Sequence, residues 1–188
     1  MKEQCKFSNV TKEYLTEFYC ILDKMIYGMT NAELTNSISH NFIVQMIPHH
    51  RAAIEMSENI LRFTTDFAVQ NIATNIIAMQ TQSIKNMSNI ECQCSSLFNS
   101  RQDLCLYQRQ FQIITQTMFT QMDNACSTNN INANFMREMI PHHRGAICMS
   151  ENALKFDICP DLIPILDKII TTQQKGIQEM NHLLRCMV

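Results

Sequence analysis

Apolar side chains recur along the chain at spacings of three, four and seven residues, which is the pattern of amphipathic helices. The first such segment carries them at Tyr14, Phe18, Ile21, Met25 and Met29. The pattern predicts three helices in the first half of the chain, over residues 11–29, 36–63 and 66–89. Glycine and proline number only 3 and 4 among 188 residues, which disfavours a turn-rich β protein and indicates a helical class.

The whole pattern returns 93 residues later. Residues 47–51, with the sequence IPHHR, return as residues 140–144, and 25 of 53 positions are identical between residues 35–87 and 128–180. Such identity at one fixed offset indicates an internal duplication. We therefore predict an all-α protein of two tandem three-helix repeats. They should pack as one bundle with pseudo-two-fold symmetry, because one unit alone would expose too much apolar surface.

The two repeats are separated by a segment rich in serine and asparagine. We predict a first repeat over residues 1–90, a linker over residues 91–101 and a second repeat over residues 102–188.

Charge and hydropathy limit the partners. Fifteen basic against seventeen acidic residues give a net charge of −2 without a basic stripe, so we expect no nucleic-acid partner. The apolar runs are short and interrupted, and the first residues show no secretory signal. We expect no membrane partner and a cytoplasmic location as the chain is numbered, with export or a cell-surface location left open.

Methionine and histidine gather on one face of the second helix of each repeat. At about 100° per residue, Met46, His49, His50, Ala53 and Met56 fall within an arc of roughly 120°. Ten of the 14 methionines form pairs at the 93-residue offset. Thioether sulfur selects Cu(I), and neutral imidazole suits copper or zinc.

The sequence therefore predicts two copper sites, with Cu(I) favoured over Cu(II) and zinc as the other candidate, for metal buffering, storage or tolerance. The predicted ligands are Met46, His49, His50, Met56 and Met87 in the first repeat, and Met139, His142, His143, Met149 and Met180 in the second. His40 and His182 have no counterpart in the other repeat, and we expect neither to bind metal.

Pro48 and Pro141 precede the two histidine pairs. A proline inside a helix removes one backbone hydrogen bond and bends the helix, whereas a proline at the first helical position is favoured. Each histidine pair is thus predicted to lie either at a bend or at the start of a helix.

No catalytic motif is present. The chain lacks the Glu-x-x-His motifs of dinuclear carboxylate bundles, a glycine-rich phosphate loop, G-x-S-x-G and H-E-x-x-H. We expect no enzyme. The alternative to copper binding is a metal-free structural or self-assembling bundle, which would form a homo-oligomer. A copper oxidoreductase is a third interpretation, and it requires an open coordination position.

The nine cysteines do not follow the repeat, because none of them pairs at the 93-residue offset. Their odd number favours reduced thiols over a disulfide framework. Cys92, Cys94 and Cys186 lie near the ends of equivalent helices, which leaves a bridge or a thiol site there open.

The motif F-x-x-x-M-x-x-H-H-x-x-A-I-x-M, followed by I-x-x-x-Q-x-x-x-I-x-x-M, resembles the bacterial family called domain of unknown function 305. It occurs twice, from Phe42 to Met87 and from Phe135 to Met180. The resemblance implies a ferritin-like helical bundle and copper binding by methionine and histidine, often in secreted or periplasmic proteins. Family members commonly carry a glutamate where this chain has Ser83 and Gly176.

Overall fold

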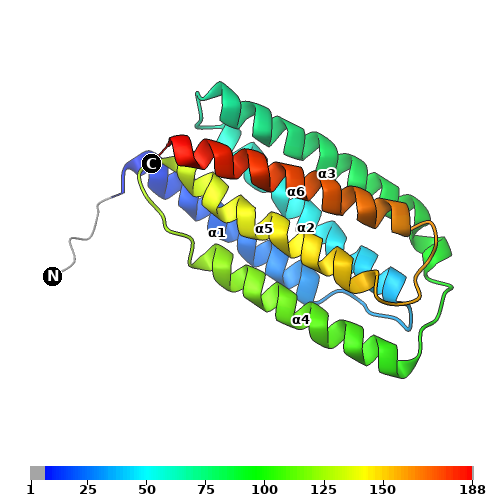
Figure 1. Cartoon of the computed structure of the whole chain (residues 1–188). Helices are drawn as coiled ribbons and strands as arrows, with labels where there is room; N and C mark the ends of the chain where they lie inside the picture. The colour runs from blue at the N-terminus through cyan, green and yellow to red at the C-terminus, as the bar shows by residue number, and fades with distance from the viewer. Residues whose placement is uncertain (1–6, 188) are drawn as a thin grey trace.

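The computed structural model describes residues 7–187 and contains six α-helices and no strand in that range (Figure 1). The predicted all-α class is confirmed. The helices are α1 (Asn9–Thr30), α2 (Ile38–Leu61), α3 (Phe67–Cys94), α4 (Arg101–Asp123), α5 (Ile131–Ala153) and α6 (Ile163–Cys186). Because α3 continues to Cys94, the connection to α4 is shorter than the predicted linker of residues 91–101.

The helices form three layers of two. The central pair, α2 and α5, packs together, with α1 and α4 on one side and α3 and α6 on the other (Figure 1). Each outer helix contacts the central helix of its own repeat, and the two helices of each layer also contact each other. The histidine-bearing helices therefore occupy the middle of the bundle, where both of their faces are covered.

Equivalent hydrogen bonds hold the first two helices of each repeat together. The side-chain amide of Asn59 donates to the carbonyl of Tyr14 at 3.0 Å, and that of Asn152 donates to the carbonyl of Tyr107 at 3.1 Å. All four of these residues are buried. The identical positions in the sequence thus make the same long-range contact twice.

Pro48 and Pro141 lie inside α2 and α5, which continue through them. The alternative prediction, that a helix begins at each of these prolines, is wrong. Helix α1 approaches Pro48 closely at Gly28, where an added Cβ would lie only 2.8 Å from the proline Cβ. A side chain at position 28 would therefore push α1 away from α2.

Within residues 7–187, no helix combines the length and the apolar character needed to cross a membrane.

Candidate metal centre

His49 and His142 meet at the centre of the bundle, where α2 packs against α5. Their rings are stacked, with centroids 3.7 Å apart and planes inclined by 27°. The Nε2 atom of His49 lies 3.2 Å from the carbonyl oxygen of His142, and the Nε2 atom of His142 lies 3.1 Å from that of His49. A carbonyl only accepts, so both Nε2 atoms carry the proton and both Nδ1 atoms carry a lone pair.

These reciprocal bonds give His49 and His142 a structural role that the sequence did not predict. A histidine bonded through one nitrogen to a backbone carbonyl can still ligate a metal through the other. The Nδ1 atoms of both residues are buried and have no hydrogen-bond partner in the described part of the chain. Coordination by these two residues therefore depends on Nδ1.

His50 and His143 flank the stacked pair. The ring centroid of His50 is 5.8 Å from that of His49, and the centroid of His143 is 6.0 Å from that of His142. The four imidazoles thus form one connected cluster across the interface between the repeats. The sequence predicted two separate sites, one within each repeat.

The two flanking histidines have different neighbours. The Nε2 atom of His50 lies 3.0 Å from the hydroxyl of Ser83 on α3. The equivalent position on α6 is Gly176, which faces the imidazole of His143. The Nδ1 atoms of His50 and His143 are also buried without a partner among residues 7–187.

Burial keeps all four imidazoles neutral at neutral pH. Loss of solvation, with a smaller contribution from His142, lowers the pKa of His50 to about 3. The pKa of His142 falls to about 4, also because of burial. Burial first and the neighbouring histidines second lower the pKa of His49 and His143 well below the ordinary value. Neutral imidazole is the form that binds metal ions, so no proton has to leave first.

The six methionines of the predicted ligand sets lie in the core, where none is more than 2% exposed. They are Met46, Met56, Met87, Met139, Met149 and Met180. Among the described residues, no three His, Cys, Asp or Glu side chains are grouped so that they could hold a metal ion. Thioether sulfur is the other soft donor that this buried core contains.

Two glutamines beside the cluster were not predicted as site residues. Gln80 and Gln173 are buried, and the Oε1 atom of each has no hydrogen-bond partner among the described residues. They border the cavities that reach His50 and His143 between α3 and α6. The available signal was their identity at the 93-residue offset, in a helix where most identical positions are apolar.

A buried carboxyl group lies one helical turn before His142. The hydroxyl of Tyr14 on α1 donates to Oε2 of Glu138 on α5 at 2.5 Å, which joins the two repeats. Burial raises the pKa of Glu138 to about 8, although the hydrogen bond from Tyr14 acts to lower it. At neutral pH this carboxyl group is therefore mostly protonated. The equivalent residue in the first repeat is Gln45.

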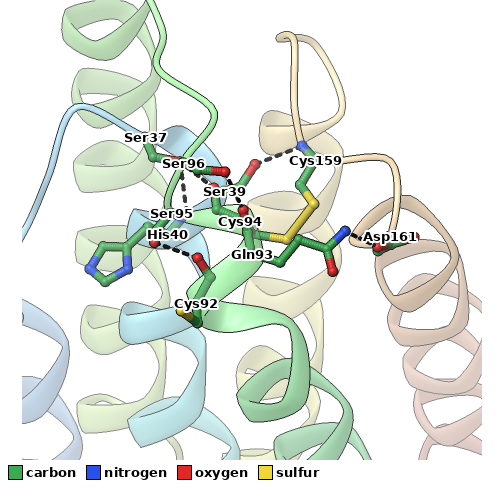
Figure 2. Close-up of a disulfide and its surroundings, with 10 residues drawn as sticks. All are labelled: Ser37, Ser39, His40, Cys92, Gln93, Cys94, Ser95, Ser96, Cys159 and Asp161. Carbon is green, nitrogen blue, oxygen red and sulfur yellow. Dashed lines mark hydrogen bonds between the residues drawn. A yellow bond between two sulfur atoms is a disulfide. The ribbon is translucent and has the colours of Figure 1, made fainter.

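Two of the nine cysteines are bonded, so the expectation of reduced thiols is wrong for them. Figure 2 shows the disulfide between Cys94, at the end of α3, and Cys159, in the connection between α5 and α6. Two serines at the start of α2 are hydrogen-bonded to the backbone of the two cysteines. The backbone N–H of Cys159 donates to Ser39 Oγ, and Ser37 Oγ donates to the carbonyl of Cys94. The sequence could not show this pairing, because the two cysteines are 65 residues apart and follow no repeat.

The remaining cysteines of the described residues are free thiols. Five are exposed and Cys148 is half-buried; the five are Cys20, Cys92, Cys105, Cys126 and Cys186. Burial and the nearby carboxylate of Glu151 raise the pKa of the Cys148 thiol. Cys5 lies outside the described residues.

The chain belongs to the family described as Domain of unknown function (DUF305), whose model matches residues 39–184. The predicted family is confirmed, and the matched span runs from α2 to α6 and includes both histidine pairs. No curated protein matches the chain.

Solved structures share this fold. A DUF305 fragment from Deinococcus radiodurans is 21% identical with a TM-score of 0.57, and the alignment covers 78% of this chain and 95% of the fragment. CopM in the Cu(II)-bound form is 26% identical with a TM-score of 0.61, over 80% of this chain and 97% of CopM. CopM in an Ag-bound form obtained by soaking is 26% identical with a TM-score of 0.59, over 80% of this chain and 97% of CopM.

Proposed function

We propose that the protein binds copper, as Cu(I), at the four-histidine cluster, and that it buffers or stores the ion without catalysing a reaction. The observation that carries this proposal is a set of four buried, neutral imidazoles whose Nδ1 atoms have no partner within residues 7–187, in a core rich in methionine. Unpartnered buried nitrogens cost free energy, and a bound ion would remove that cost.

The donor types favour a soft ion. Thioether sulfur and neutral imidazole together suit Cu(I), whereas a hard cation would require oxygen ligands. CopM, which shares the fold, is known in Cu(II)-bound and Ag-bound forms. Silver as Ag⁺ is a soft ion with the charge of Cu(I), so the same donors would hold both.

The inner and outer histidines would contribute differently. His49 and His142 already use Nε2 to join the repeats, so they offer only Nδ1. His50 and His143 border the cavities between α3 and α6, and they are the ligands most open to an incoming ion. Removal of the outer pair should therefore weaken binding while leaving the central stacking intact.

The test is a competition titration of Cu(I) against a coloured chelator, without oxygen and with a reductant that spares disulfides. Exposed thiols also bind Cu(I), so they are first blocked with iodoacetamide. We expect the double variant His50→Ala, His143→Ala to bind at least about tenfold more weakly than the unaltered chain.

The matched control is the double variant His40→Ala, His182→Ala, which removes two histidines outside the cluster and should bind as the unaltered chain does. Equal affinity of the two double variants would contradict the proposal. So would the absence of tight binding by the blocked, unaltered chain. A melting temperature indifferent to copper and to chelators would then support the metal-free assembly protein instead.

A further inference from the structure

A groove runs along the outer side of the histidine cluster, between α3 and α6. It consists of two adjoining cavities of about 350 Å³ each, one bordered by His143 and the other by His50. The residues that border both cavities define what we call the α3–α6 groove: Met79, Gln80, Lys168, Thr172 and Gln173. Exposed residues on both helices border it, so the groove connects the cluster with the surface.

The two outer histidines meet this groove in unlike ways. The hydroxyl of Ser83 is hydrogen-bonded to Nε2 of His50. Gly176, the equivalent residue beside His143, has no side-chain group to offer, and a Cβ added there would lie 3.1 Å from His143 Nε2. An incoming ion must displace the Ser83 hydroxyl to reach His50 Nε2, and it meets no such group at His143.

Met79 supplies a soft donor within the groove. Its side chain is 42% exposed, whereas the methionines of the predicted ligand sets are buried. It has no methionine partner in the other repeat, because the equivalent residue is Thr172. A partly exposed thioether that borders both the cavity at His50 and the cavity at His143 is placed to bind a soft cation first.

The charged residues along the groove give its two halves the same net charge. Lys168 borders both cavities, so its charge opposes a cation equally at His50 and at His143. Lys175 borders only the cavity at His143, and its ammonium group lies 3.7 Å from the carboxylate of Glu179. The difference between the two halves therefore rests on Ser83 and Gly176.

We propose that a soft monovalent cation enters through the α3–α6 groove, binds first to the sulfur of Met79, and reaches His143 before His50. This inference rests on the proposed function, because it assigns the entry route and the order of loading to the same cluster. According to this inference, the outer histidine of the second repeat binds the ion before that of the first, although both belong to the same sequence motif.

The order of loading can be followed by NMR of the histidine side chains, with thiols blocked and Ag⁺ added to half an equivalent. We expect the resonances of the His143 ring to shift before those of the His50 ring. In Ser83→Ala, which frees His50 Nε2, the two rings should shift together. The reciprocal change Gly176→Ser should delay His143. An earlier shift of His50 in the unaltered chain, or an order unaffected by Ser83→Ala, would overturn the inference.

If Met79 binds the ion only during entry, its replacement should change the rate of Ag⁺ uptake and leave the equilibrium affinity nearly unchanged. Met79→Leu keeps the size of the side chain but removes the donor, and the exposed position should tolerate it. We expect the rate of Ag⁺ uptake to fall about tenfold while the equilibrium affinity stays within about twofold. Met187→Leu, at a half-buried methionine away from the groove, is the control. An unchanged rate with intact binding refutes this entry route alone, whereas a lack of equilibrium binding by the unaltered chain refutes the proposed function.

Discussion

The first and second repeats carry the same histidine motif, yet the structure gives them different surroundings. At the centre they are equivalent, since His49 and His142 stack and exchange matching hydrogen bonds. Away from the centre they diverge, with Ser83 facing one outer histidine and Gly176 the other. The duplication is thus retained at the stacked histidines and has diverged beside the two outer ones.

Two further differences lie at contacts between the repeats. Glu138 of the second repeat is bonded to Tyr14, whereas the first repeat has Gln45 at that position. The disulfide links the end of α3 to the segment before α6 at one end of the groove only, because the residues equivalent to Cys94 and Cys159 are Met187 and Asp66. One end of the pair α3 and α6 is therefore cross-linked and the other is not.

Removal of the cross-link should have the largest effect on stability. The double variant Cys94→Ala, Cys159→Ala opens a loop of 65 residues, for which the loop-closure entropy predicts a loss of up to about 4 kcal/mol. Urea unfolding measures this loss. The control is Cys92→Ser, at an exposed free thiol two residues away, which should change the stability by less than about 0.5 kcal/mol. Equal stabilities of these two variants would show that the cross-link does not constrain the unfolded chain.

Disruption of the stacked pair should come next. His49→Ala leaves a cavity in the core and an unpaired carbonyl on His142, which together should cost about 3 kcal/mol. His142→Ala should cost the same amount, because the contacts are reciprocal. His182→Ala, at an exposed residue, serves as the reference in the same unfolding experiment. A large difference between the two inner variants would disprove the equivalence of the repeats at the centre.

The carboxyl group of Glu138 should produce a smaller effect that depends on pH. Its pKa is raised to about 8 in the folded chain, so its contribution to stability is complete below the unfolded value near 4.5 and is lost as the pH rises towards 8. Glu138→Gln removes this loss. Its stability relative to the unaltered chain should therefore increase by about 2 kcal/mol between pH 6.5 and 8.5.

The first repeat provides the converse experiment. Gln45 is buried at the equivalent position, so Gln45→Glu should introduce a second carboxyl group whose contribution is lost with rising pH. Urea unfolding at three pH values compares both variants with the unaltered chain. If the stability difference between Glu138→Gln and the unaltered chain did not vary with pH, the carboxyl group would titrate normally in the folded protein.

Much of the fold was predictable because helix periodicity and the repeat are local or fixed-offset signals. Apolar spacing located α1, α2 and α3 to within five residues at every end, and the offset of 93 residues located their counterparts. The same signals identified the histidine pairs and the paired methionines, which are buried. Whether these side chains ligate a metal stays a prediction, which the titration above tests.

The stacking of His49 on His142 was not predictable, because identity at a fixed offset shows that two residues are equivalent and not that they touch. The bond between Tyr14 and Glu138 spans 124 residues and has no counterpart in the other repeat. The disulfide joins cysteines that lie outside the repeat pattern. Each of these contacts arises only when helices from different repeats are packed together.

The amino-acid sequence by itself determined the helical class, the duplication and the residue types that face the interior, since periodicity and composition act along a single chain segment. Only the tertiary structure decided that the two histidine pairs form one cluster and which cysteines are bonded. It also decided that a serine hydroxyl is hydrogen-bonded to one outer histidine, whereas a glycine faces the other. These features depend on distances between segments far apart in the chain, and those distances are set by how the six helices exclude water from their shared core.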